Sequence, residues 1–264
     1  VIYAEQSPYQ RIVVTQSRRT TRLFLNNNLQ FSSDDERRYH EVLIHPAVAA
    51  MGRPPRTVLV LGGGDGLGVR EVLRYASVER VLVVDLDPAV TKLFSSAPLG
   101  LALNEGALTD PRVEIQNGDA FRYLDESSEA FDFIVVDFPD PSNYALGKLY
   151  TLTFYQRLRE RLGMRGVAVV QSTSPYYARR AFWSVAATMA DFTTLPMHVY
   201  VPSFGEWGFV IAGGEGMREP TKLLVDEPLV FLDERTLPGL FQFPSDMDRV
   251  EAPINRLNDQ QLVP

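Results

Sequence analysis

The sequence predicts an α/β protein with a doubly wound, mostly parallel sheet that follows a small antiparallel β domain. From residue 57 onward, short continuous apolar runs alternate with helical stretches, as expected for strands buried on both faces. Residues 1–31 instead alternate and turn like an antiparallel sheet. The 264 residues, 45% of them hydrophobic, are enough for a full-sized core. We therefore expect two domains, residues 1–50 and 51–264.

The first domain combines a small sheet with a linking helix. Strand-like segments cover residues 9–15, 22–25 and 29–31, and three asparagines predict the turn between the last two. Ser33 and the acidic residues after it predict a helix N-terminus, and this helix should continue to about Ala50.

The second domain alternates strands with helices and ends in a Pro-rich, irregular extension over residues 216–264. The expected strands cover residues 57–61, 81–84, 113–115, 133–136, 166–170, 198–201 and 208–212. The expected helices cover residues 66–76, 88–97, about 118–124, 151–162 and 176–190. This order predicts a mostly parallel sheet with an antiparallel edge near the C-terminus.

Composition excludes several classes of function. The net charge is −7 and no basic run is longer than a pair, which argues against a nucleic-acid partner and favours a cationic ligand. The absence of cysteine excludes disulfides and thiolate sites. No stretch approaches the roughly 18 apolar residues of a membrane-spanning helix.

An aspartate inside a glycine loop is the most specific feature. Gly62, Gly63 and Gly64 end a buried strand, and Asp65 follows them. Glycine loops bind pyrophosphate through backbone N–H groups and a helix N-terminus, so a carboxylate in the loop would repel that ligand. The loop should prefer a neutral or cationic ligand; the alternative is a tight turn without a ligand.

Two further acids extend this pattern. Asp85 ends the next strand, where a carboxylate typically accepts both hydroxyls of a ribose. Asp119 follows the strand after that and could accept a hydrogen bond from the adenine amine, although it could simply cap a helix. Together they favour an adenosyl sulfonium over NAD. Asp65 would attract the amine of such a ligand and repel its carboxylate, which favours a decarboxylated form.

Asp137 and Asp140 follow the fourth strand of the second domain in a segment stiffened by two prolines. They could orient a diamine, share a metal or be ordinary loop acids. A metal is disfavoured because hard divalent ions need more oxygen ligands and no histidine accompanies the pair. A primary amine, whose pKa is about 10, must lose a proton before it attacks carbon, and a fixed carboxylate is a suitable acceptor.

The motifs that these residues form resemble those of the spermidine synthases, or polyamine aminopropyltransferases. The matching segments are residues 7–10, 38–41, 62–66, 69–73, 85–87, 110–113, 118–120, 137–141 and 154–155. The resemblance implies a Rossmann-like fold of the S-adenosylmethionine-methyltransferase type. It also implies transfer of an aminopropyl group from decarboxylated S-adenosylmethionine to putrescine or a related diamine, giving spermidine and 5′-methylthioadenosine, with no tightly bound cofactor and no metal.

The resemblance also implies roles for individual residues. Asp137 matches the proton acceptor. The residues matching the amine site are Tyr39, His40 and Asp140, and the residues matching the donor site are Gln10, Gly62, Gly63, Gly64, Asp65, Asp85, Asp119 and Ala120. His40 could equally be a packing residue, and we expect His45 and His198 to be structural.

The chain departs from the family pattern around the amine acceptor. Residues 137–148, the acceptor segment, lack the usual serines. The short stretch at the end of this segment, which is usually acidic and which we call the gate, is apolar here and contains Lys148. A tyrosine usual near the C-terminus is missing, and Glu206 and Trp207 are expected to reshape the acceptor pocket. These variants resemble a subgroup tethered to a multi-spanning N-terminal membrane region, with this domain in the cytosol. Family members are commonly homodimers or homotetramers.

Two other functions stay open at this point. The chain could be a methyltransferase that uses intact S-adenosylmethionine, or a catalytically silent binding or regulatory domain. The presence of Asp65, Asp137 and Asp140 together argues against the silent domain, because the fold itself requires none of them.

Overall fold

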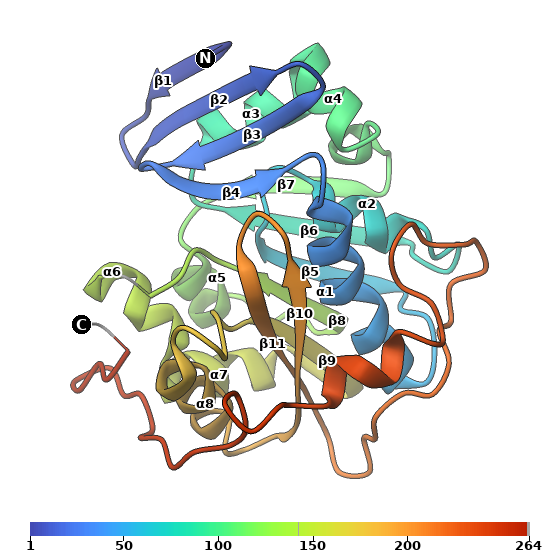
Figure 1. Cartoon of the computed structure of the whole chain (residues 1–264), viewed down its shortest axis with the longest axis vertical. Helices are drawn as coiled ribbons and strands as arrows, with labels where there is room; N and C mark the ends of the chain where they lie inside the picture. The colour runs from blue at the N-terminus through green and yellow to red at the C-terminus, as the bar shows by residue number, and fades with distance from the viewer. Residues whose placement is uncertain (142, 263–264) are drawn as a thin grey trace.

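A computed structural model describes residues 1–141 and 143–262 of the chain, so that Ser142 of the acceptor segment and residues 263–264 lie outside the described part. The N-terminal part forms a four-stranded antiparallel sheet at one end of the molecule (Figure 1). Its strands, in spatial order, are β1 Tyr3–Gln6, β2 Arg11–Ser17, β3 Thr20–Leu25 and β4 Asn28–Ser32. The small antiparallel sheet is confirmed, and β1 is an additional strand.

The asparagine turn and the linking helix are also present. Asn26 and Asn27 have φ of 50° and 68°, a left-handed conformation that asparagine tolerates and that tight hairpins need. Helix α1 runs over Glu36–Met51. Asp35 precedes it, but its carboxylate accepts hydrogen bonds from the backbone N–H and the hydroxyl of Ser203, at 2.6 and 2.9 Å. The start of α1 is thereby fixed to the turn between β10 and β11.

The central sheet has seven strands in the order β10-β11-β9-β8-β5-β6-β7. Their bounds are β5 Thr57–Gly62, β6 Arg80–Asp85, β7 Val113–Asn117, β8 Phe131–Asp137, β9 Leu162–Gln171, β10 Thr193–Val201 and β11 Gly205–Gly213. Strands β5 to β9 are parallel, which confirms the α/β fold class.

The antiparallel edge predicted near the C-terminus is present, but its two strands are not in sequence order. Strand β11 lies between β9 and β10 and pairs antiparallel with both. The short turn between Val201 and Gly205 makes β10 and β11 a hairpin, and it is β11 that pairs with β9. The edge strand β10 therefore runs parallel to β9.

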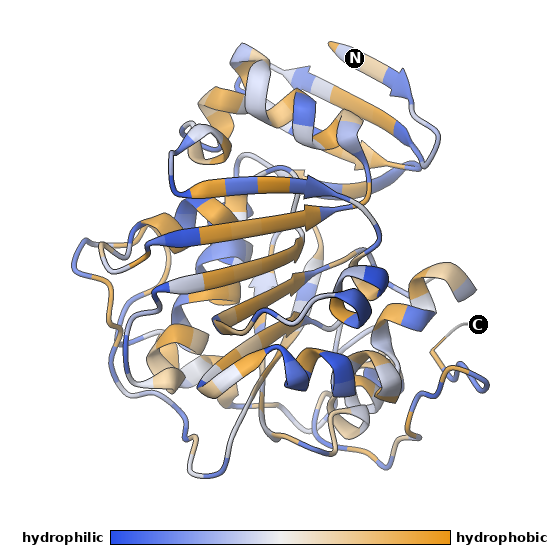
Figure 2. Cartoon of the chain, turned by 180° about the vertical axis from the view of Figure 1, so that it is seen from behind, coloured by the Kyte–Doolittle hydropathy of each residue, from blue (hydrophilic) through white to orange (hydrophobic). Residues whose placement is uncertain are grey.

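Helices cover both faces of this sheet, and the strands between them are mainly hydrophobic (Figure 2). The helices after α1 are α2 Leu67–Leu73, α3 Pro88–Ser96, α4 Pro98–Leu103, α5 Ala120–Glu126, α6 Tyr144–Gly147, α7 Leu152–Glu160 and α8 Arg179–Thr188. Alternate strand residues pack against α1, α2 and α3 on one face and against α5, α7 and α8 on the other. Helix α4 was not predicted, and α7 ends earlier than predicted because β9 already begins at Leu162.

Residues after β11 are irregular, as predicted, apart from the short 3-10 helix η3 Leu237–Phe241. In the described part of the chain, no helix is long and apolar enough to cross a membrane.

The glycine loop after β5 fits between the ends of β6 and β8 only because it lacks side chains. Gly62 has φ of 79°, and a Cβ on it would lie 2.3 Å from the carbonyl oxygen of Asp137. A Cβ on Gly64 would lie 2.7 Å from the carboxyl carbon of Asp85. The loop is therefore held against both predicted site acids.

Gly62→Ala is expected to lower the free energy of unfolding by about 2–4 kcal/mol, because it adds backbone strain and a steric clash. Gly118→Ala is the matched control, since a Cβ there would meet nothing within 4 Å. Urea unfolding of both variants measures the difference. Equal stability of the two variants would contradict this account of the loop.

Candidate active site

The predicted site acids meet at the carboxyl ends of three neighbouring strands. Asp65 follows β5, Asp85 ends β6, and Asp137 ends β8, where it pairs in register with Gly62. Strand β5 lies between β6 and β8, so this is the point where the order of the sheet reverses. Ligands of open α/β sheets bind at such points.

Asp85 is held rigidly at the glycine loop. Its Oδ2 accepts a hydrogen bond from the N–H of Gly64 at 3.1 Å, and its Oδ1 accepts one from the N–H of Asp87 at 2.9 Å. Burial raises the pKa of Asp85 to about 6, since the two N–H groups offset only part of the desolvation and Asp65 and Asp87 add negative charge. The carboxylate thus has free acceptor capacity for neutral donors such as hydroxyl groups.

Asp87 is a site residue to which sequence reasoning gave no role. It is buried, its Oδ1 caps α3 through the N–H of Ala89, and its Oδ2 accepts hydrogen bonds from Ser7 and Gln10. The Ser7 hydroxyl lies at 2.6 Å and the Gln10 amide at 3.0 Å. Gln10, predicted to contact the donor, is thereby placed beside the loop that follows β6. An acid directly before Pro88 is the helix-start signal that could have singled out Asp87.

Asp119 both caps a helix and forms an ion pair. Its Oδ1 accepts a hydrogen bond from the N–H of Phe121 at 2.8 Å, and its Oδ2 lies 2.6 Å from Nζ of Lys148. Ala120 follows as the buried first residue of α5. Asp119 therefore does cap helix α5, and a contact of Asp119 and Ala120 with adenine stays a prediction. Lys148 joins the gate to the predicted adenine end of the site.

Asp137 lies within a buried polar group on the opposite side of the loop. Tyr39 of α1 donates a hydrogen bond from Oη to Oδ1 of Asp137 at 2.5 Å. Burial raises the pKa of Asp137 to about 6; the negative charge of Asp65 adds to this, while His40 and Tyr39 oppose it. The pKa of Asp65 is also raised, mainly by burial. Asp65 and Asp137 are both half-buried, and their negative charges lie close enough to affect each other, so the arrangement suits a cationic ligand.

Asp140 is oriented by the end of β9. Its carboxylate accepts hydrogen bonds from Nε2 of Gln171 and from the hydroxyl of Thr173, both at 3.0 Å. Thr173 has φ of 62°, which is strained for a β-branched residue. This conformation is stabilised because Thr173 accepts a hydrogen bond from the N–H of Gly208 at 2.7 Å. Burial raises the pKa of Asp140.

Glu206 and Trp207 lie on opposite faces of β11. Trp207 packs on Phe204, with ring centroids 5.3 Å apart, and Phe204 lies 6.3 Å from the ring of Tyr39. The carboxylate of Glu206 is instead 2.5 Å from Nδ1 of His198. That the two residues shape the acceptor pocket stays a prediction, and Glu206 is already paired with His198.

The remaining histidines are bound within the protein. His198 Nε2 lies 2.9 Å from the carbonyl oxygen of Gln242, and buried His45 lies between Tyr75 and Glu71. Both fit the structural role expected of them. Within residues 1–141 and 143–262, no group of three or more His, Cys, Asp or Glu side chains is arranged to hold a metal ion.

Comparison with known proteins agrees with this geometry. The family model of the spermine/spermidine synthase domain matches residues 36–222. The chain is 51% identical over its whole length to a polyamine aminopropyltransferase of Leptospira interrogans and 50% identical to polyamine aminopropyltransferase 2 of Ralstonia nicotianae. It covers 53% and 52% of those proteins, so it spans about half the length of the curated relatives it matches.

Solved structures give the same result. A crystal structure of spermidine synthase in complex with the transition-state analogue AdoDATO superimposes with a TM-score of 0.84 at 27% identity, covering 92% of this chain and 85% of that one. Spermidine synthase from Thermotoga maritima superimposes with a TM-score of 0.82 at 26% identity, covering 92% of this chain and 84% of that one. The chain therefore belongs to the spermine/spermidine synthase family.

Proposed function

We propose that the chain transfers the aminopropyl group of decarboxylated S-adenosylmethionine to putrescine or a related diamine, giving spermidine or its analogue and 5′-methylthioadenosine. The observation that carries this proposal is the pair of half-buried acids formed by Asp65 in the glycine loop and Asp137, which lies against Gly62 and Gly63. Asp65 suits the ammonium group of a donor that has lost its carboxylate. Asp137 suits the removal of a proton from the attacking amine.

The reaction is a direct displacement. The lone pair of the amine nitrogen forms a bond to the aminopropyl carbon next to sulfur, and the carbon–sulfur bond breaks. Its electron pair goes to sulfur, which leaves as the neutral thioether of methylthioadenosine. The proton of the attacking nitrogen goes to Asp137, whose Oδ1 is held by Tyr39. Holding both substrates in line at the sheet edge supplies the rest of the acceleration.

The donor is assigned to the loop side of the site. Asp85 has free acceptor capacity for ribose hydroxyls, while Gln10 reaches the same region from the N-terminal sheet through Asp87. Asp119 and Ala120 lie at the next strand end and suit the adenine. The diamine is assigned to the side of Tyr39, Asp140 and Trp207. Incubation with diamines of different length would show which diamine is preferred.

The pH dependence follows from the proton acceptor. Asp137 must be ionised to take a proton, and its pKa in the empty site is about 6. Below that pH the carboxylate is protonated, so kcat/KM is expected to fall about tenfold per pH unit. A pH profile of methylthioadenosine release checks this. A rate constant that does not change between about pH 5 and pH 7 would contradict the role of Asp137.

The proposal is tested by incubating the protein with decarboxylated S-adenosylmethionine and a series of diamines that differ in length. Methylthioadenosine and an aminopropylated amine are expected in equal amounts. Absence of product with every amine would overturn the proposal. A homodimer or homotetramer, a membrane tether and a cytosolic location stay predictions, which chromatography of the chain and fractionation of cells expressing the full protein would test.

A further inference from the structure

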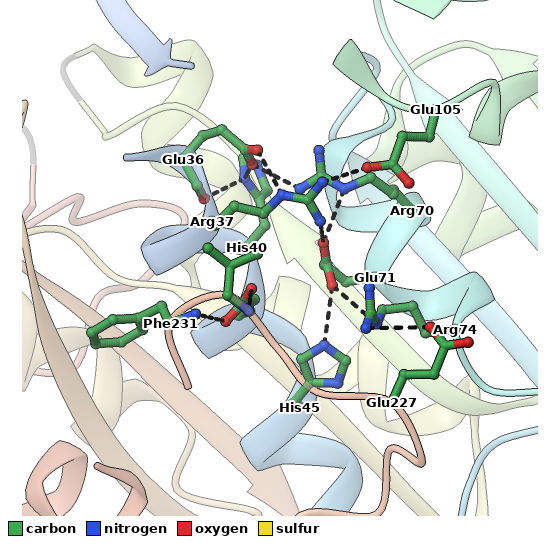
Figure 3. A network of polar contacts seen from close by, with 12 residues as sticks. Glu36, Arg37, His40, His45, Arg70, Glu71, Arg74, Glu105, Glu227 and Phe231 are labelled. Atoms are coloured by element: carbon green, nitrogen blue, oxygen red, sulfur yellow. Dashed lines mark hydrogen bonds and ion pairs between the residues drawn. The ribbon is translucent and has the colours of Figure 1, made fainter. Parts of the chain in front are cut away.

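A largely buried ionic network connects helices α1 and α2 around Glu36, Arg70 and Glu71 (Figure 3). Glu36, in the first turn of α1, accepts a hydrogen bond at Oε2 from Nη2 of Arg70 at 2.9 Å. Arg70 also donates to Glu71 and to the carbonyl oxygen of Leu103, both at 2.9 Å. Arg37 lies 3.3 Å from Glu36 and 2.9 Å from Glu71. The two buried carboxylates are therefore already compensated by two guanidinium groups.

Glu36 also fixes the ring of His40. Nδ1 of His40 lies 2.9 Å from the backbone oxygen of Glu36 and 2.8 Å from its Oε2. Glu36 is ionised, because its pKa is lowered to about 2; burial opposes this shift, but His40 and Arg70 outweigh it. Both neighbours of Nδ1 are therefore acceptors, and Nδ1 must carry a proton. Only Nε2 can change its protonation state.

Nε2 is the nitrogen left for a ligand. In the part of the chain that the structure describes, Nε2 of His40 has no hydrogen-bond partner, while the ring as a whole is 3% exposed. The charges facing this ring come from Glu36 and Arg70 behind it and from Asp65 and Asp137 on the site side.

A proton on Nε2 of His40 would compete with a substrate ammonium group for this nitrogen. Burial lowers the pKa of His40, but the hydrogen bond and charge of Glu36, together with Asp65 and Asp137, raise it overall. A primary ammonium group has only donors, so it cannot hydrogen-bond to a protonated Nε2. A protonated Nε2 would therefore have to lose its proton before it could accept a hydrogen bond from such a group.

We propose that Glu36 is a positioning residue: it fixes His40 with Nδ1 protonated, so that Nε2 is the nitrogen that accepts a hydrogen bond from a substrate ammonium group. The inference rests on the proposed function for the identity of the substrate, but not for the state of His40. The ammonium group belongs either to the donor or to the diamine.

Nitrogen-15 NMR of histidine-labelled protein tests the state of His40 without turnover. The chain has three histidines, and His40→Gln assigns one of them. In the unsubstituted protein, Nδ1 of His40 is expected to stay protonated up to about pH 9 while Nε2 titrates. A neutral His40 with the proton on Nε2 would overturn the proposal, whether or not the protein is an aminopropyltransferase.

Glu36→Gln and Glu71→Gln form a matched pair. Each removes one buried carboxylate from the same two arginines, but Glu36 contacts His40 whereas Glu71 contacts His45. Both variants are expected to lose stability. Only Glu36→Gln should shift the titration of His40 downward, by at least about one pH unit, because it removes the negative charge beside Nδ1. An unchanged His40 in Glu36→Gln, or an equal change in Glu71→Gln, would overturn the proposal.

Steady-state kinetics then show whether the ammonium group that binds His40 belongs to the donor or to the diamine. Near pH 8, Glu36→Gln is expected to raise the KM of one substrate about three- to tenfold with kcat nearly unchanged, because the hydrogen bond from the ammonium group to Nε2 is weakened. Varying the donor and the diamine separately shows which substrate responds. In a His40→Gln background, Glu36→Gln should add nothing. An unchanged KM for both substrates, or the same effect in that background, would overturn the proposal.

Discussion

Replacing Asp137 with asparagine is expected to reduce kcat by about 10²- to 10⁴-fold while donor binding changes little. The amide has the shape of the carboxylate and still accepts the hydrogen bond from Tyr39, but it cannot take a proton from the amine. Single-turnover release of methylthioadenosine measures the chemical step, and calorimetry measures donor affinity.

Asp140→Asn is the control for Asp137→Asn. Asp140 lies three residues further along and is held by Gln171 and Thr173. Its substitution removes the same charge without removing the proton acceptor, so it should raise the KM of the diamine more than it lowers kcat. If Asp137→Asn instead weakened donor binding as much as it lowered kcat, Asp137 would be a structural residue.

Replacing Asp65 with asparagine is expected to weaken binding of decarboxylated S-adenosylmethionine about 10- to 100-fold and binding of methylthioadenosine less than about twofold. The donor carries an ammonium group that a buried carboxylate can pair with, and methylthioadenosine does not. The substitution also removes a negative charge that raises the pKa of Asp137, so the acid limb of the pH profile should move to lower pH.

Asp85→Asn serves as the control for Asp65→Asn. Asp85 faces the proposed ribose position, and both ligands contain the same ribose. Its substitution should therefore weaken both ligands by similar factors, as measured by calorimetry. Equal weakening of the two ligands by Asp65→Asn would remove its proposed role in holding the ammonium group.

Much of the fold could be predicted because burial on two faces leaves a clear pattern in the sequence. Continuous apolar runs such as residues 57–61 become parallel strands, and Asn26 and Asn27 form the predicted turn. The position of β11 could not be predicted, since neighbouring strands in a sheet are selected by packing and the sequence pattern of a strand does not give its direction. Strand β1 is largely exposed and lacks the apolar signal.

The site acids could be predicted because each one follows a strand, and parallel strands bring their carboxyl ends to one edge. Their partners could not. Glu36 and Arg70 are 34 residues apart on two helices, where charged residues are usually exposed, so nothing in the spacing indicates a buried pair. Glu206 shows the same limit, because its neighbours in the sequence do not reveal that it pairs with His198.

The most direct test of the central proposal offers the protein a choice of donor. Equal concentrations of intact and decarboxylated S-adenosylmethionine are supplied with a single diamine, and the products are identified by mass spectrometry. Selection by Asp65 and transfer to an amine activated by Asp137 predict methylthioadenosine and an aminopropylated diamine. S-adenosylhomocysteine and a methylated product would contradict the proposal and identify a methyltransferase instead.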